Sequence, residues 1–541
     1  MYKNKCMFML WVLVLSFALL LTGCNNYSNQ ETVVSENAVE NEENGEEKEQ
    51  NNHVFHFATN QDIPHLDPHG TGANTSFRVT YMLYDRLVTY DGTSTDIKPM
   101  LAKKWDISED GTVYTFFLRD DAKFHDGSPV TAEAVKYSFI RAMRVGKSAA
   151  GQFKKVIDEN SFEIVDDHTI KITLTHAYAP FLKTLGTVYA NIVNPVLAEH
   201  EGEDLGEAYL ADRDLGSGPY SLESWDRGQK IVLKANDTYW GGAPQLKTVN
   251  ILVVPEASTA RIMLEKAEVD LLDPSVISPE VLAEMDGKNG VKVYSSPSYK
   301  LVFGDMNNEK PPFDDPLIRK AFVHAINYDA IIENIYLGDA AQVNSAVPRG
   351  MFGFNQNTKM NTYDLEQAKK YIEEAGYKDD LEFEISISEN DEVYKNMAVT
   401  IQSDLAKIGV TATIKEYAWP TYLDLITTGG HNVSLGSWTP DFADPDYNLW
   451  YFAHSSSKGP GFNTAFYENK RVDELLEEGR TTVDEQRREA IYQEIQSIMA
   501  DDIPYAFIAQ TNERAPARDT VKGYEINPMN TWYVPFHKMS K

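Results

Sequence analysis

The residues whose types and spacing most suggest chemistry lie in GSWTPDFADPDYNLW, residues 436–450. Two tryptophans and three aspartates share this stretch, and two prolines interrupt it. Aromatic side chains favour burial, whereas a carboxylate removed from water needs a cationic partner. The residues alone are equally consistent with a ligand-binding wall and with a structural role, in which Trp438 packs in a core and Asp441 caps a helix.

Motifs of enzymatic chemistry are poorly represented. The sequence contains no G-x-S-x-G, no H-E-x-x-H, no G-x-x-x-x-G-K-[ST] and no G-x-G-x-x-G. Residues 455–458 match S-x-x-K, but they lie in a polar stretch flanked by glycine and proline, and the companion motifs S-D-N and K-T-G are missing. The sequence therefore indicates no catalytic residues.

A cluster of histidines near the start of the globular region raises the alternative of a metal site. Its members are His53, His56, His65 and His69. Pro64 and Pro68 exclude the helical spacing that would place His65 and His69 on one face. We therefore predict loop or surface histidines and no metal site.

Residues 1–24 have the pattern of a secretory signal. Lys3 and Lys5 precede an apolar run that is too short for a typical spanning helix. The run ends in LTGC, which resembles the bacterial lipobox and predicts that residues 1–23 are removed and that Cys24 carries lipid, palmitate included. The alternative is an uncleaved anchor. Both interpretations place the remaining chain outside the cytoplasm, tethered to the outer face of a bacterial membrane, with a Gram-positive host favoured.

The segment 24–53 is predicted to be a disordered acidic tether, because its eight glutamates and single lysine accompany few apolar residues. Both cysteines of the chain, Cys6 and Cys24, precede the globular region, so disulfides and cysteine metal sites are excluded there. Of the formal net charge of −31, −26 remains on residues 53–541. This charge argues against nucleic acid as a partner.

Helical and strand patterns alternate through the remaining residues. LEFEISIS (381–388) alternates as a half-buried strand does, and 168–176 and 248–255 also predict strands. Predicted helices begin after Asp315 and Asp364, and glycines at 376 and 409 end two of them. So long a chain exceeds one core, so we expect two or three α/β lobes joined by short strands.

Several stretches together resemble one family. They are LDP (66–68), TFFLRDDAKFHDGSPVTAEAVKYSF (115–139), GSGPY (216–220), NNEKPPFDDPLIRKAFVHAIN (307–327) and WTPDFADPD (438–446). Their order and spacing resemble the family 5 extracytoplasmic solute-binding proteins, which serve oligopeptide, dipeptide and nickel ABC importers. Much of the match is scaffold: Gly127 and Pro129 should shape a turn, Thr131 should cap a helix, and Gly216 and Gly218 should permit a tight bend.

The resemblance implies an α/β fold of the periplasmic-binding-protein type, with two lobes closing on a ligand about a strand hinge. An extra domain is inserted in the N-terminal lobe. The implied divisions are lobe I (54–80, 177–300 and 505–541), the extra domain (81–176) and lobe II (301–504).

The resemblance also assigns a ligand site. Its implied members are Asp441, Trp438, Trp419, Gly436, Ser437 and Lys310. Asp441 would hold a peptide's α-ammonium group, the 436–438 strand would bond its main chain, and the two tryptophans would wall the cleft. Lys310 would reach the other end of the peptide. Asp444 and Asp446 are expected to cap or brace the next turn, with direct contact to the ligand as the alternative for each. Leu435 stands where some oligopeptide binders have arginine, which leaves the preferred peptide length open.

The function implied is that of a substrate-binding lipoprotein, not an enzyme, which delivers peptides to the permease subunits of an ABC transporter. It would act as a monomer without a cofactor. A binding protein for a nickel–chelator complex or another small solute is the alternative within this class, and an exported hydrolase is the alternative outside it.

Overall fold

The computed structural model describes residues 53–147, 153–377 and 381–541. The predicted signal, Cys24 and the acidic tether lie outside these residues. Within the described residues, no helix is both long and apolar enough to cross a membrane. The described residues form one compact unit.

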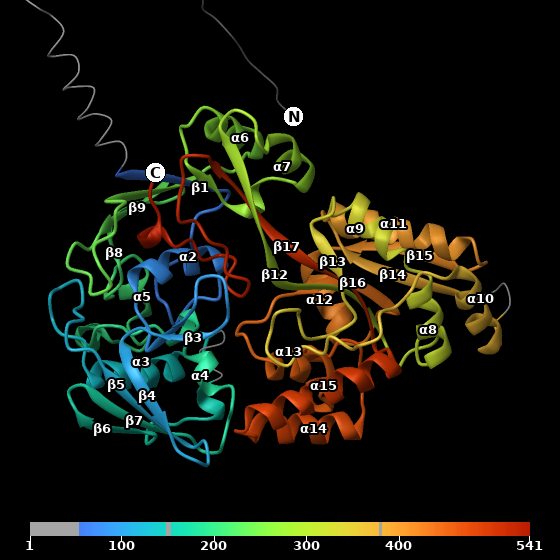
Figure 1. Ribbon diagram of the computed structural model, residues 1–541, viewed down its shortest axis with the longest axis horizontal. Coiled ribbons are helices and arrows are strands. Elements are labelled where there is room, and N and C mark those ends of the chain that lie inside the picture. The colour runs from blue at the N-terminus through green and yellow to red at the C-terminus, as the bar shows by residue number, and fades with distance from the viewer. Residues whose placement is uncertain (1–52, 148–152, 378–380) are drawn as a thin grey trace, which may run out of the picture. The chain divides into compact units, whose positions relative to one another are not determined.

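A mixed sheet of eleven strands organises this unit (Figure 1). Ten strands follow one another across it: β15 (Thr411–Tyr417), β14 (Glu382–Ser388), β16 (Val433–Trp438), β12 (Val291–Met306), β17 (Tyr505–Arg518), β11 (Leu271–Leu272), β1 (Val54–Thr59), β10 (Thr248–Val253), β9 (Lys230–Ala235) and β8 (Tyr220–Asp226). β13 (Ala340–Gln342) pairs with β17. We call the part with β1 and β8–β11 the first lobe and the part with β14–β16 the second lobe.

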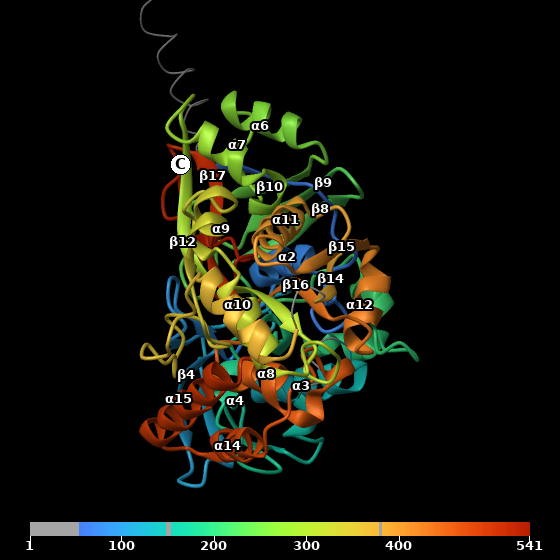
Figure 2. The same cartoon turned by 90° about the vertical axis from the view of Figure 1, so that its right-hand side faces the viewer.

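Two long antiparallel strands join the lobes. β12 has 16 residues and β17 has 14, and they pair along most of their length, as Figures 1 and 2 show. The pairing shifts register between Pro297 and Leu301 and again between Val302 and Phe303. The prediction of short crossing strands is therefore wrong: both strands are long, and β12 pairs with β16 of the second lobe over 301–306, whereas β17 pairs with β11 of the first lobe at Ala517.

A second, four-stranded antiparallel sheet lies within the segment predicted as an extra domain. It contains β4 (Ala102–Ile107), β5 (Val113–Leu118), β7 (Thr169–Thr173) and β6 (Phe162–Asp166), in that order, and α3 (Ala132–Val145) lies between β5 and β6 in the chain. β2 (Val88–Tyr90) and β3 (Ile97–Pro99) form a separate pair. Phe116 and Phe139 belong to the same buried cluster as Phe55 and Phe57 of β1, so the core of this segment is continuous with that of the first lobe.

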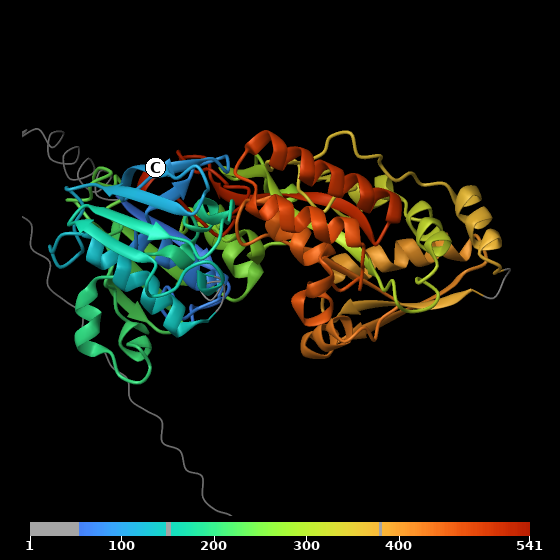
Figure 3. The same ribbon diagram turned by 90° about the horizontal axis from the view of Figure 1, so that it is seen from below.

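Two further buried clusters lie mainly in the second lobe, and the second of them also includes Tyr90 of β2 and Met529. One lies between its strands and the helices that follow β12, and it includes Phe322, Ile385 and Ile401. The other, around Leu475 and Tyr492, packs the last three helices together. Figure 3 shows the chain from about 301 to 504, yellow to red, as a group of elements separate from the blue-to-green N-terminal segment.

The helices of the chain have these bounds: α2 (Asn74–Leu83), α4 (Phe181–Thr184), α5 (Glu207–Leu210), α6 (Ala257–Glu265), α7 (Pro279–Met285), α8 (Pro316–His324), α9 (Tyr328–Asn334), α10 (Leu365–Glu374), α11 (Glu392–Ala406), α12 (Trp419–Thr427), α13 (Pro445–Ala453), α14 (Lys470–Thr481) and α15 (Glu485–Asp502).

Predicted helix starts and strands are mostly confirmed. The Asp315 carboxylate accepts from the Leu317 amide at 2.8 Å, and that of Asp364 accepts from the Gln367 amide at 2.9 Å. The strands predicted at 168–176, 248–255 and 381–388 are β7, β10 and β14. Thr131 occupies the N-cap position of α3, but its side chain makes no capping hydrogen bond.

The chain bends at Gly218 as predicted, and Gly216 and Gly218 also permit a close approach between two segments. Neither has a left-handed backbone conformation. A Cβ atom on Gly216 would lie 1.8 Å from the Leu83 carbonyl oxygen, and one on Gly218 would lie 2.4 Å from the Met82 carbonyl oxygen. The amide of Gly218 donates to Leu83 at 2.9 Å. Both glycines therefore let the chain lie directly against the end of α2.

We expect Gly216→Ala to lower the free energy of unfolding by about 1–3 kcal/mol, because the backbone of α2 must move to admit a methyl group. Gly202→Ala is the matched control, since a Cβ there meets only the Asp204 carboxylate at 3.5 Å. Urea denaturation of both variants measures the difference. Equal stabilities would contradict the close-approach explanation.

Candidate ligand-binding site

Two adjoining cavities meet beside the 436–451 segment. The first cavity, of about 530 Å³, is lined by side chains from 153–189 on one side and from 441–480 on the other. The second cavity, of about 380 Å³, is lined by second-lobe residues. Tyr451 and Phe462 line both cavities, so the two spaces are neighbours.

The loop between β16 and α13 forms part of the wall of the first cavity. Asp444 is the N-cap of α13, since its carboxylate accepts from the Asp446 amide at 3.0 Å, and Pro445 occupies the first helical position, where no amide proton is needed. The amide of Ala443 donates to the Tyr90 hydroxyl at 3.2 Å. These contacts fix the loop at its helical end and against the first lobe.

Asp444 and Asp446 each have an arginine partner. Arg488 of α15 contacts both carboxylate oxygens of Asp444, at 2.5 and 2.8 Å, and both side chains are buried. Arg480 of α14 contacts both oxygens of Asp446, at 3.0 and 3.1 Å. Their predicted role of bracing this turn is confirmed.

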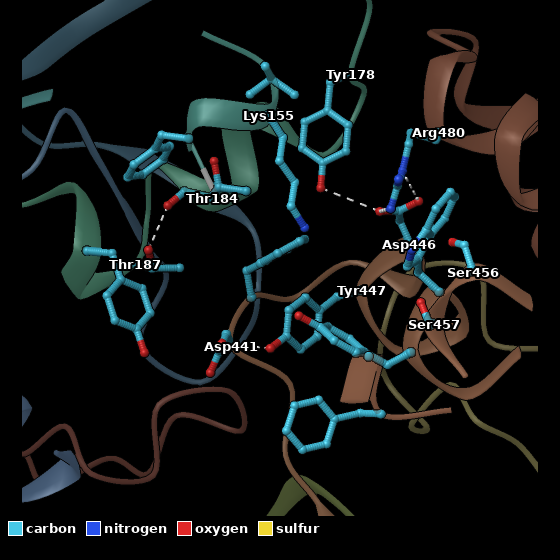
Figure 4. A pocket seen from close by; sticks show the side chains of 18 of the residues that line it. Lys155, Tyr178, Thr184, Thr187, Asp441, Asp446, Tyr447, Ser456, Ser457 and Arg480 are labelled. Carbon is cyan, nitrogen blue, oxygen red and sulfur yellow. Dashed lines mark hydrogen bonds and ion pairs between the residues drawn. The ribbon is translucent and has the colours of Figure 1, made fainter. Parts of the chain in front are cut away.

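Asp441 differs from these two aspartates. Its carboxylate lines the first cavity and accepts one hydrogen bond, from the Tyr447 hydroxyl at 2.6 Å (Figure 4). Within the part of the chain that the structure describes, no cationic side chain pairs with it. Burial raises the pKa of Asp441, and the hydrogen bond from Tyr447 opposes this shift. The site thus contains a carboxylate that a cationic group would stabilise.

Gly436, Ser437 and Trp438 end strand β16 and line the second cavity. The whole of β16 pairs with β12 on one side, whereas on its other side only Val433 and Ser434 pair with β14. On that side of 436–438, the described chain supplies no further strand. An extended molecule could therefore add to this edge through main-chain hydrogen bonds.

Aromatic rings surround Trp438. The rings of Tyr451 and Phe462 lie 5.3 and 5.6 Å from it, and its indole nitrogen is buried without an acceptor among the described residues. Trp419 also lines the second cavity, stacks on Tyr422 and is 59 % exposed. The structure thus brings together four of the six predicted site residues in one cavity and places Asp441 in the adjoining one.

Lys310 lies apart from the other five. It lines neither cavity, and its ammonium group donates to the carbonyl of Gly430. The turn that follows β12, in which the Lys310 amide bonds Asn307 and its carbonyl accepts from Phe313, directs the side chain there. No contact in the described chain supports its predicted role at the far end of a ligand.

Among the four histidines considered for metal binding, only His56 departs from the prediction of loop or surface positions, because it belongs to β1. His69 lies in a turn, as predicted, but is buried beside Arg141 at 3.1 Å. Burial, and then the charge of Arg141, lower the pKa of His69 to about 4. Within 53–147, 153–377 and 381–541, no group of three potential ligands could hold a metal ion.

The wall of the first cavity formed by residues 153–189 contains no predicted site residue. Lys155 and Tyr178 line it, and the Tyr178 hydroxyl donates to Asp446 at 3.4 Å. No local pattern marks these residues, because they face 441–480 only after distant segments pack together.

Comparisons with known proteins identify the relatives of the chain. The profile of bacterial extracellular solute-binding proteins, family 5 Middle, matches residues 96–460. The probable D,D-dipeptide-binding periplasmic protein of Escherichia coli (strain K12) is 35 % identical over 481 residues, which cover 88 % of this chain and 92 % of that protein. Heme-binding protein A of Haemophilus influenzae is 31 % identical over 520 residues, which cover 92 % and 93 %.

Solved structures agree with these relatives. The ABC transporter-associated periplasmic binding protein of Helicobacter pylori, in complex with the peptide STSA, has a TM-score of 0.74 at 31 % identity, covering 91 % of this chain and 99 % of that one. HbpA2 of Haemophilus parasuis has a TM-score of 0.80 at 26 % identity, covering 90 % and 99 %. The predicted two-lobed α/β fold is confirmed.

Asp444 and Asp441 should respond differently to the loss of charge. Asp444→Asn keeps the helix cap but leaves Arg488 buried without a carboxylate, so the free energy of unfolding should fall by about 3–5 kcal/mol. Asp441→Asn removes an unpaired carboxylate, so the free energy of unfolding should rise at pH 7.

Thermal unfolding over a pH series checks this prediction. Because the pKa of Asp441 is raised in the folded protein, its destabilising charge is fully present above that pKa and vanishes on protonation. The advantage of Asp441→Asn should therefore shrink as the pH falls. A destabilised Asp441→Asn at pH 7 would make Asp441 a structural residue.

Proposed function

Because the chain belongs to the family 5 bacterial extracellular solute-binding proteins, we propose that it captures short peptides and delivers them to the permease subunits of an ABC importer. The observation that carries this proposal is the unpaired Asp441 carboxylate in the wall of the first cavity. A peptide's α-ammonium group supplies the missing positive charge and three hydrogen-bond donors.

The open edge at 436–438 supports the same proposal. A peptide added to this edge would bond through its main chain, which gives affinity without selecting side chains. Trp438 and Trp419 would then provide apolar walls for the side chains in the second cavity.

The names of relatives favour short peptides. One relative is a probable D,D-dipeptide-binding protein, another from Escherichia coli (strain K12) is a dipeptide-binding protein, and the Helicobacter pylori structure holds a tetrapeptide. Leu435, where the sequence lacks the arginine of some oligopeptide binders, is buried and lines the second cavity. That position offers no charge to a ligand.

Two alternatives have specific observations behind them. The relative named heme-binding protein A favours another small solute. Ser456 and His454 contact each other at 2.7 Å at the first cavity, which suggests a hydrolase. The same histidine nitrogen lies 3.1 Å from the Ser456 amide, as in a local cap, which favours a structural role for this pair.

The central test combines a variant with a modified ligand. We would measure binding of L-alanine peptides of two to five residues and of D-Ala-D-Ala by calorimetry, and take the tightest binder as the reference peptide. Asp441→Asn and N-acetylation of this peptide should each lower its affinity about thirtyfold or more, because each removes one partner of a buried charge pair. Combined, they should cost little more than either alone.

Asp424→Asn is the control, since Asp424 is exposed on α12 and lines neither cavity. It should bind the reference peptide as the wild type does. If free and acetylated peptides bind the wild type equally, Asp441 is not an amine anchor. Cleavage of any peptide during the titration would favour the hydrolase.

We also propose that the mature protein begins at a lipid-modified Cys24 and is held, as a monomer, on the outer face of the membrane of a bacterium, with a Gram-positive host favoured. The lipobox-like LTGC sequence supports this proposal. Mass spectrometry of protein extracted from membranes should find residues 1–23 absent and a lipid mass on Cys24, and Cys24→Ala should abolish that mass. A wild-type chain that begins at another residue would contradict the lipid anchor.

A further inference from the structure

The charged side chains of the first cavity do not cancel in pairs. Besides His176, whose ring contacts the Thr175 hydroxyl, two acids and two bases line it: Asp441, Asp446, Lys155 and Arg480. Asp446 and Arg480 form a two-pronged ion pair. Since Asp446 and Arg480 neutralise each other, one anion, Asp441, and one cation, Lys155, remain without a charged partner in the lining of the cavity.

Lys155 is held in place by its neighbours. Phe153 and Val156 are buried in the core that extends from the first lobe, and the Val156 carbonyl accepts from the Thr175 amide at 2.8 Å. The Lys155 side chain extends between Tyr178 and Tyr447 toward the middle of the cavity (Figure 4). In the described parts of the chain, no acidic side chain forms an ion pair with it.

The surroundings of Lys155 also suit an added anion. Lys155 is exposed as a residue, but its ammonium group is partly screened from water by the cavity wall. This partial burial, and then the charge of Arg480, lower the pKa of Lys155, and only Asp446 opposes the shift. A carboxylate placed against the ammonium group would favour its charged form.

We infer that Lys155 holds the carboxylate of the ligand, so that the first cavity recognises a short zwitterion by both ends. This inference rests on the proposed function, because it requires the ligand's ammonium group to be on Asp441. It assigns the far end of the ligand, for which the sequence suggested Lys310, to a residue on the opposite wall.

The two anchors belong to different parts of the chain. Asp441 follows β16 of the second lobe, whereas Lys155 lies between α3 and β6, beside the four-stranded sheet. A zwitterion of suitable length therefore bonds both walls, and a peptide that is too long or has a blocked end can bond only one. The ligand class is a free peptide with both termini charged.

The test uses the reference peptide in its free, C-terminally amidated and N-acetylated forms. Amidation should lower the affinity of the wild type about ten- to hundredfold, since it removes a charge-assisted contact. Lys155→Met should bind the free peptide more weakly by a similar factor and should no longer distinguish free from amidated peptide. It should keep the full penalty for N-acetylation.

Lys154→Met is the matched control. Lys154 is the neighbouring exposed lysine, and it lines neither cavity. Its variant should behave as the wild type does with all three peptides. Because both lysines are exposed, both variants should also unfold at the wild-type temperature.

Three results would overturn the inference. If amidation leaves wild-type affinity unchanged while acetylation lowers it, the ammonium anchor holds and the carboxylate anchor fails. If Lys155→Met retains the amidation penalty, another group holds the carboxylate. If neither modification affects the wild type, the proposed peptide ligand itself fails, and Lys155 has no carboxylate to hold.

Discussion

Three carboxylates lie close together in the loop after β16 and the first turn of α13, and only two arginines pair with them. Arg488 and Arg480 take Asp444 and Asp446, each through two oxygens, and the third carboxylate, Asp441, has one hydroxyl donor. Removing one partner of a buried ion pair strongly destabilises the folded protein, so the two pairs hold the loop in position. The remaining carboxylate is therefore presented by a rigid support.

The two arginines also explain why the last helices of the second lobe are needed for the site. α14 and α15 contribute no predicted ligand contact, yet they carry the side chains that neutralise the loop. The same loop contacts the first lobe through Ala443 and Tyr90, so its position is fixed from three directions. Unsatisfied charge is tolerated at Asp441 because its neighbours supply the stability, as is common at functional sites.

Local patterns in the sequence predicted strands and helix caps, because these features depend on residues that are close together in the chain. The alternation at 381–388 and the caps Asp315 and Asp364 are short-range features, and the structure confirms them. The length of β12 and β17 could not be read in this way, because long-range pairing determines it. The close approach of Gly216 to Leu83 is likewise a contact between distant segments.

The residues of the site differ in the same way: some lie in motifs that can be read from the sequence, and others reach the site only through long-range packing. Asp441 and the tryptophans lie in recognisable motifs, and the structure brings them to adjoining cavities. Lys310 lies in a motif too, but a local turn directs it to Gly430. Lys155 has no motif, and only the packing of its segment against the first-lobe core brings it to face Asp441. His69 shows the same limit, since its burial depends on the distant Arg141.

The paired strands β12 and β17 determine how the two lobes can move. Two separate strands would let the lobes rotate and shift freely, whereas two strands hydrogen-bonded to each other form one stiffer ribbon. The regular pairing of this ribbon is interrupted where the register shifts between Pro297 and Leu301. There the side chain of Gln510 donates to the Ser298 carbonyl at 2.8 Å. Interrupted pairing bends a ribbon more easily than regular pairing does. A second shift, between Val302 and Phe303, lies close by, so the ribbon that joins the lobes should bend most easily over residues 297–303.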